Sequence, residues 1–176
     1  MNAQQTAGTP RQIAENQYKV ARGNLLMMIA LTLLNIVLLF AGSNTMMLFS
    51  ATVPYYAAIL GWASEDQVFL TVNLVIAGIC LLAYLLCWIF SKKHYGWMIA
   101  ALVMFIMDTL ALVGIYLMIE DFSGIMDFLI HAWVLYYLFL GVTNGRKLKQ
   151  LPEEVVEAET VAPMEDSTPF DGQTLS

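Results

Sequence analysis

The sequence predicts an all-α, polytopic membrane protein with four transmembrane helices and a short interfacial or re-entrant helix between the first two. Of its 176 residues, 59% are hydrophobic and 12% are charged, whereas a soluble domain has roughly 25% charged residues. The hydrophobic residues also form long runs, and a helix that crosses a bilayer needs about 20 of them. We therefore predict one transmembrane domain, residues 24–151, with spans at 24–42, 67–90, 95–119 and 124–143.

The positions of the basic residues predict how these helices are threaded. If residues 46–62 do not span, all eight Lys and Arg residues lie on one side of the membrane. The loops on the other side then contain acidic residues and no basic ones. Because short cytoplasmic loops are enriched in Lys and Arg, we expect a multi-pass plasma-membrane protein with both termini in the cytoplasm.

The N-terminal segment, residues 1–23, is polar and is predicted to lie in the cytoplasm. We expect little regular structure in it beyond one amphipathic turn near residues 13–20. The apolar run that follows is predicted to be a retained helix and not a signal peptide, because its polar lead is long and no clear cleavage site follows it.

Residues 46–62 are nearly all apolar, yet Pro54 interrupts them. Pro suits the first turn of a helix, and Gly, here Gly61, suits its end. The segment is rich in Tyr, Phe and Trp, and Tyr and Trp are enriched at membrane interfaces. We predict a short helix that lies in the outer leaflet or dips into it. Irregular backbone at this depth needs protein around it, so the segment should pack against the bundle.

The C-terminal tail, residues 152–176, accounts for the low isoelectric point of the chain. It contains half of the 14 acidic residues and no Lys or Arg, and the net charge of the whole chain is −6. Its composition is typical of a disordered segment, and we expect it in the cytoplasm. Because the chain has no large basic patch, the sequence excludes a nucleic-acid partner.

Polar side chains inside the predicted spans are the candidates for a functional site. Asp108 is the only charged residue of the run 96–118, and a carboxyl at the centre of a span costs at least ~2.5 kcal/mol. Counting residues along each span predicts two polar layers. One contains Asp108 with Asn35, Thr32 and a tyrosine, Tyr136 or Tyr137, and the other contains Asn73 with His131 and Asp127.

Two interpretations of Asp108 remain open. An acid inside a membrane is a functional-site hypothesis, here a proton or ligand site. In the structural interpretation, Asp108 is hydrogen-bonded to Asn35 and joins two helices, as polar side chains do in membrane bundles. A lone acid without a second acid or a buried base would be a poor proton relay. His131 is likewise either a hydrogen-bonded interface residue or a group that titrates near neutral pH.

The motifs of common enzymes are absent from the sequence. It contains no G-x-S-x-G, no C-x-x-C and no second acid deep in a span, so we expect no enzyme, no catalytic residues, no metal and no cofactor. The prediction is a non-catalytic membrane module or accessory subunit, which contacts the lipid bilayer and a protein partner or a second copy. The alternative is an oligomeric proton- or cation-coupled small transporter that uses Asp108.

Three stretches of the chain carry a resemblance. SNTMMLFSATVPYY, KKHYGWMIAALVMFIMDTLAL and HAWVLYYLFLGV, in this order, resemble a group of small four-helix bacterial membrane proteins without an assigned function. The resemblance covers most of residues 20–152. It implies a place in the bacterial inner membrane, and it implies no activity and no catalytic residues.

Overall fold

The computed structural model describes residues 9–43, 45, 47, 49–119 and 125–152, and these contain five α-helices and no strand. All of the helices except α2 are long and apolar enough to cross a membrane. The predictions of an all-helical fold, of four such helices and of a short helix between the first two are therefore confirmed. The helices are α1 (Pro10–Phe40), α2 (Thr52–Trp62), α3 (Gln67–Phe90), α4 (Gly96–Ile119) and α5 (Ile125–Gln150).

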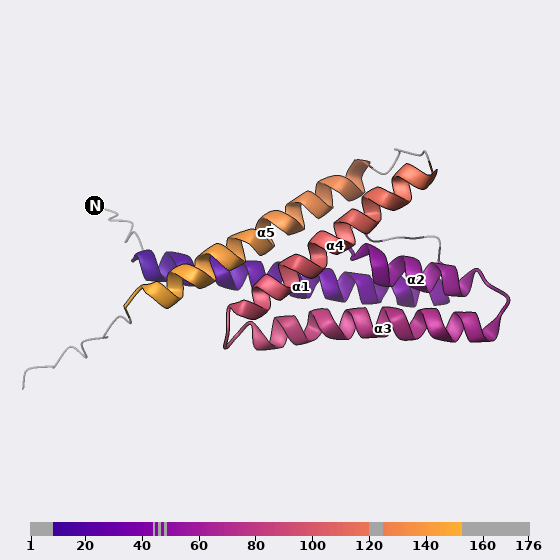
Figure 1. Ribbon diagram of the computed structural model, residues 1–176, viewed down its shortest axis with the longest axis horizontal. Coiled ribbons are helices and arrows are strands. Elements are labelled where there is room, and N and C mark those ends of the chain that lie inside the picture. The colour runs from indigo at the N-terminus through magenta and orange to yellow at the C-terminus, as the bar shows by residue number, and fades with distance from the viewer. Residues whose placement is uncertain (1–8, 44, 46, 48, 120–124, 153–176) are drawn as a thin grey trace, which may run out of the picture.

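The helices form two groups that meet at one end (Figure 1). α4 and α5 pack against each other and diverge from α1, α2 and α3 toward the end remote from both chain termini. α2 packs mainly on α3 and also contacts α1 and α4. The two described ends of the chain lie together, because the Arg11 guanidinium donates to the carbonyl oxygens of Leu151 and Pro152 at 3.0 and 2.8 Å. The predicted acidic tail beyond Pro152 lies outside the described residues.

α1 begins at Pro10, fourteen residues before the predicted start of the first span at residue 24, and it includes the segment 13–20 for which the sequence predicted a single amphipathic turn. The reason is a capping box at Thr9, whose hydroxyl accepts the Gln12 N–H at 3.3 Å while the Gln12 side chain accepts the Thr9 N–H at 3.3 Å. Pro10 then occupies the first helical position, where an N–H would have no partner inside the helix. The prediction of one short turn near 13–20 was wrong, and one helix continues from Pro10 into the apolar run.

α5 continues past Asn144 and Gly145, where the sequence predicted its end. Gly141 and Gly145 are four residues apart and lie against neighbouring elements. A Cβ atom at Gly141 would lie 2.8 Å from the Cβ of Ala21 in α1, and one at Gly145 would lie 2.7 Å from the Cβ of Tyr95. Such small residues let membrane helices approach closely. The two glycines, both within α5, therefore allow close packing, and α5 stays helical to Gln150.

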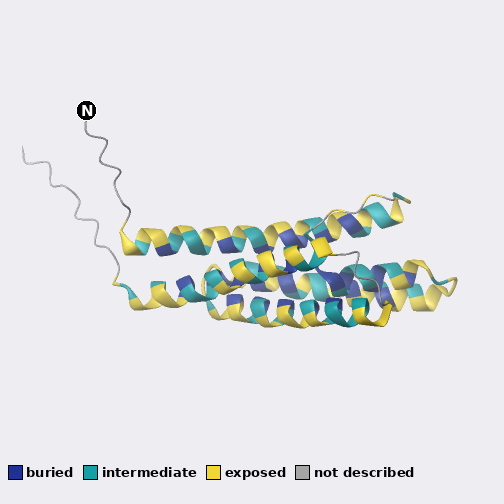
Figure 2. Cartoon of the chain, turned by 90° about the horizontal axis from the view of Figure 1, so that it is seen from above, coloured by how far each residue is buried: buried dark blue, intermediate teal, exposed yellow. Residues whose placement is uncertain are grey.

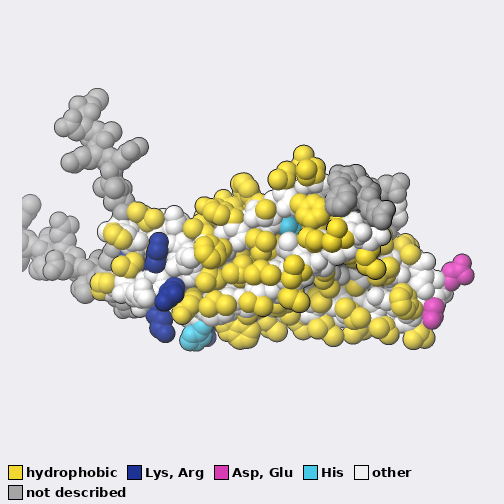
Figure 3. Space-filling model, turned by 45° about the horizontal axis from the view of Figure 1, so that its top comes forward, with side chains coloured by type: hydrophobic (Ala, Val, Ile, Leu, Met, Phe, Trp, Pro, Cys, Tyr) yellow, Lys and Arg dark blue, Asp and Glu magenta, His cyan; other side chains and the backbone are white. Residues whose placement is uncertain are grey.

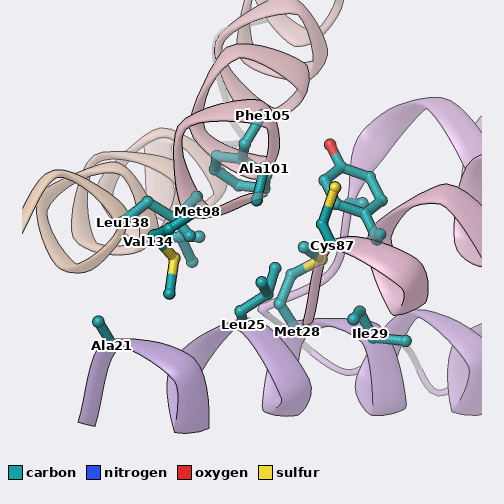
Figure 4. Close-up of a cluster of buried hydrophobic side chains, with 12 residues drawn as sticks. Ala21, Leu25, Met28, Ile29, Cys87, Met98, Ala101, Phe105, Val134 and Leu138 are labelled. Atoms are coloured by element: carbon teal, nitrogen blue, oxygen red, sulfur yellow. The ribbon is translucent and has the colours of Figure 1, made fainter. Parts of the chain in front are cut away.

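The core lies where α1, α3, α4 and α5 face one another (Figure 4). Leu25 and Met28 of α1 lie opposite Phe105 of α4 and Leu138 of α5, and all four side chains are fully buried. Figure 2 shows that buried residues occupy the inner faces of the helices, whereas exposed residues follow the outer faces.

The outer surface is apolar over most of its length. Large hydrophobic side chains such as Leu33, Met107 and Phe139 are more than half exposed, at 53%, 63% and 59%. On the face seen in Figure 3, Lys and Arg side chains gather toward the end that holds the termini, and Asp and Glu toward the opposite end. A continuous apolar surface of this extent is unusual for a soluble monomer, and it suits contact with lipid.

The Gly141 contact gives a first prediction. We expect Gly141→Ala to lower the free energy of unfolding by about 1–3 kcal/mol, because an added methyl must displace Ala21 or the helix backbone. Gly114→Ala is the matched control, since a Cβ at Gly114 meets nothing within 4 Å. Unfolding in mixed micelles measures both, and equal stabilities of the two variants would contradict the close α1–α5 packing.

Candidate functional site

The segment that connects α1 to α2 is held by a side chain of α1. Asn35 is 1% exposed. Its Oδ1 accepts the Met47 N–H at 2.7 Å, and its Nδ2 donates to the Met47 carbonyl oxygen at 2.7 Å. The side-chain amide of Asn35 therefore pairs with both the N–H and the carbonyl group of Met47. Two residues later, Phe49 has a φ of 80°, a left-handed conformation that is strained for a bulky residue.

The first turn of α2 lies inside the bundle, and its polar groups are all accounted for. The first four N–H groups of any helix lack a partner within the helix. Here the Ala51 N–H donates to Thr32 Oγ1 at 2.8 Å. The Thr52 and Val53 N–H groups donate to the two carboxylate oxygens of Asp108, Oδ2 and Oδ1, at 2.8 and 2.7 Å. The next residue, Pro54, has no N–H at all, so no donor of this turn is left unpaired.

Asp108 binds this helix terminus from the middle of α4. Its side chain is 2% exposed, and each of its oxygens accepts one backbone N–H. The N-terminus of a helix carries a partial positive charge, so the carboxylate and the helix end compensate each other electrically. Hydrogen bonds to an ionised group are about twice as strong as neutral ones. Asp108 therefore fixes where α2 begins, halfway along the bundle.

His131 of α5 completes the site. Its Nε2 lies 3.0 Å from Thr52 Oγ1 and 3.3 Å from Asp108 Oδ2. Its ring stacks on Phe105, with the ring centroids 5.0 Å apart and the planes inclined by 18°, and the residue is 4% exposed. Three helices thus supply side chains to the first residues of α2: α1, α4 and α5.

The hydrogen-bond geometry defines the tautomer of the His131 ring. Its Nδ1 lies 2.9 Å from the Asp127 carbonyl oxygen, which only accepts, so Nδ1 carries a hydrogen. In the neutral ring, Nε2 accepts a hydrogen bond from the Thr52 hydroxyl.

The predicted polar layers are only partly present. Thr32 and Asp108 both bind the start of α2, but Asn35 binds Met47 and not Asp108, so the expected Asp108–Asn35 bond was wrong. Tyr136, in contrast, is 60% exposed, whereas Thr32 and Asp108 are buried. The carboxylate accepts hydrogen bonds from the backbone instead, because the N–H groups at the start of α2 have no other acceptor, whereas the Asn35 amide pairs with Met47.

The second predicted layer does not form. Asn73 donates to the Phe69 carbonyl of its own helix at 3.0 Å, and the Asp127 carboxylate accepts from the Tyr116 hydroxyl at 2.7 Å. His131 lies beside Asp108 rather than Asn73. The predicted depths assumed upright helices, whereas α4 and α5 run obliquely to α1–α3 (Figure 1), so equal counts along two helices do not give equal heights.

Gly61, predicted to lie at the end of the short helix, is the penultimate residue of α2. A Cβ there would be 3.0 Å from the Cβ of Asn73, so this glycine allows α2 to pack closely on α3. The site residue that the sequence analysis missed is Thr52. The signal available was Pro54, because a proline in a first turn leaves three N–H groups that need acceptors, and a lone buried acid elsewhere is a ready acceptor.

Comparisons with protein-family models, with curated proteins and with solved structures find no match. No family is shown by them, and the resemblance to small bacterial membrane proteins stays a prediction. Among the residues that the structure describes, no group of three or more His, Cys, Asp or Glu side chains is placed to hold a metal ion.

Thr32 offers a test of this site. We expect Thr32→Val to lower the free energy of unfolding by about 1–3 kcal/mol, because it leaves the buried Ala51 N–H without an acceptor. Thr109→Val is the control, since the Thr109 hydroxyl donates only to Phe105 of its own helix. Hydrogen exchange of residues 49–53 should accelerate in the first variant alone, and unchanged exchange would contradict the assigned role.

Proposed function

We propose that the protein is a non-catalytic membrane module in which a polar centre holds a re-entrant helix, α2, inside a bundle of four spanning helices. The observation that carries this proposal is the bonding of α2. Thr32 and Asp108 bind the three N–H groups of its first turn. Asn35 binds the segment before it. These side chains are occupied by the chain's own backbone, which supports a structural role over a ligand site.

As an accessory subunit, such a module would act through a protein partner or a second copy. The proposed location is the bacterial inner membrane, with both termini in the cytoplasm. The separation of basic and acidic side chains to opposite ends of the apolar surface (Figure 3) supports this threading. In that orientation α2 begins at the depth of Asp108, where Thr52 and Val53 bond the carboxylate, and runs back to the outer side, where it joins α3.

Cysteine labelling tests the threading. In a background with Cys80→Ala and Cys87→Ala, an impermeant maleimide should label Glu65→Cys in intact spheroplasts. It should label Lys93→Cys and Ser176→Cys only after lysis. Finding positions 93 and 176 on opposite faces of the membrane would contradict the four-span arrangement.

The contact between Thr52 and His131 resembles a nucleophile beside a base, but its surroundings support a structural role. In hydrolases, backbone N–H groups near the nucleophile stabilise the oxyanion. Here the nearby N–H groups of Thr52 and Val53 are bonded to the Asp108 carboxylate. Thr52 itself is 4% exposed. A substrate carbonyl at this position would have to displace the carboxylate, so we propose no catalysis.

Asp108→Asn tests the structural role. An asparagine presents one oxygen and one NH₂ group to two N–H donors, so one donor loses its acceptor and the charge is lost. We expect a loss of at least about 2 kcal/mol in stability, since hydrogen bonds to charged groups contribute ~1.5–3 kcal/mol. Asp127→Asn is the control acid, because its amide oxygen still accepts from Tyr116. Equal stability of the two variants would argue against the proposal.

The second candidate is proton-coupled transport, and one observation favours it. Asp108 and His131 lie 3.3 Å apart, so the acid has a buried base beside it, which the sequence analysis did not expect. Half-helices that begin in the middle of a bundle also occur in transporters. Proton flux into liposomes that contain the protein distinguishes the two candidates. If the protein is a non-catalytic module, we expect no flux above that of empty liposomes. Flux that is lost in folded Asp108→Asn or His131→Gln protein would establish the transporter instead.

A further inference from the structure

A basic cavity lies at the end of the bundle that holds the chain termini. It has a volume of about 790 Å³ and is formed by α1, α5 and the turn between α3 and α4. Its basic lining residues are Arg11, Lys92, Lys93, His94 and Lys149. Among the described residues that line it, none is acidic. It also reaches the beginning of α4 at Gly96, where the partial positive charge of the helix end adds to that of the side chains.

The turn that forms one wall of this cavity is fixed by α1. The Tyr18 hydroxyl donates to the Ser91 carbonyl oxygen at 2.6 Å. The Arg22 guanidinium donates to Ser91 Oγ at 2.9 Å and to the Trp88 carbonyl oxygen at 3.1 Å. Two of these bonds satisfy carbonyl oxygens at the C-terminal end of α3, those of Trp88 and Ser91. The cavity wall is therefore preformed and does not depend on a ligand.

The lysines of the cavity have no partner among the residues that the structure describes. Within the described part of the structure, no hydrogen bond or ion pair involves the side chains of Lys92, Lys93 or Lys149. Arg11, in contrast, is paired with Glu15 at 3.4 Å and bonded to the end of α5. Three ammonium groups thus line one cavity without an anionic partner in the described part of the chain, which is the charge pattern of a site for an external anion.

The apolar part of the lining indicates what carries that anion. Ile99 and Leu148 also line the cavity. Phe90 and Trp97, the sequence neighbours of the lining residues Ser91 and Gly96, are 41% and 39% exposed, with their rings 5.0 Å apart. Trp is enriched at the level of lipid headgroups. A ligand with a charged head and an apolar continuation matches both parts of the lining.

We propose that this cavity binds the phosphate group of an anionic phospholipid, with Lys92, Lys93 and Lys149 around the phosphate and Ile99 beside the first part of the acyl chains. The inference rests on the proposed threading, which places this end of the bundle at the inner membrane surface. Basic pockets between helices on that side are suited to anionic headgroups. A soluble phosphate compound shares the headgroup chemistry but has no apolar part to contact Ile99 and Leu148.

Native mass spectrometry of the full chain tests the site. Detergent-solubilised protein is titrated with phosphatidylglycerol and, separately, with phosphatidylcholine. We expect selective retention of phosphatidylglycerol, and at least a tenfold loss of its apparent affinity in the triple variant Lys92→Gln/Lys93→Gln/Lys149→Gln, since each lysine near an anionic surface contributes roughly a fivefold effect. If that variant is not recovered folded, the double variant Lys93→Gln/Lys149→Gln replaces it in the same assay.

The control variant, Lys19→Gln/Arg146→Gln/Lys147→Gln, removes the same charge outside the cavity lining and should bind as the unmodified protein does. Equal losses in the two variants, or equal retention of phosphatidylcholine, would overturn the proposal. Displacement of the lipid by millimolar inorganic phosphate would assign the site to a soluble phosphate compound and would overturn the proposal of a lipid ligand. Because binding in detergent needs no membrane orientation, such a failure is distinct from failure of the threading in the labelling experiment.

Discussion

The bond between the Asp108 carboxylate and the N-terminus of α2 is the interaction on which the centre of this molecule depends. A helix that begins among apolar side chains brings up to four unpaired N–H groups and a partial positive charge. A carboxylate in the same surroundings brings a negative charge that is just as unfavourable alone. When the carboxylate bonds the helix end, the unpaired N–H groups gain acceptors and the two opposite charges compensate each other. The Thr32 hydroxyl accepts from the remaining N–H group, that of Ala51, and Pro54 has no N–H.

Other helix ends of the bundle follow the same rule. Tyr18 and Arg22, one turn apart on α1, bond the C-terminal end of α3, and Arg11 bonds the carbonyl groups that follow α5. In each case a side chain from one helix satisfies the end of another that is distant in sequence. This pattern ties the N-terminal extension of α1 to its neighbours, and among the described residues it leaves lysines, rather than arginines, available around the basic cavity.

Long, strongly patterned features were predictable, whereas features set by contacts across the bundle were not. The four apolar runs identified the long helices, and Pro54 identified the start of a short one. The capping box of Thr9 and Gln12 is a sequence pattern from which the start of α1 could have been predicted. The continuation of α5 through Gly145 could not be predicted, because a glycine near the end of an apolar run indicates a helix end. Only the structure shows that Gly145 allows the close approach of Tyr95. His131 was identified as a candidate but was placed beside the wrong partner.

The sequence by itself determined the class of this protein, because hydrophobic run length and the location of Lys and Arg depend only on the order of residues. It also singled out Asp108, since one charge in an apolar run needs an explanation. Only the tertiary structure decided what that carboxylate binds. Its acceptors face the backbone of α2, and backbone N–H groups are identical in every residue except proline. The sequence therefore shows which side chain needs a partner, and the fold shows which peptide groups provide it.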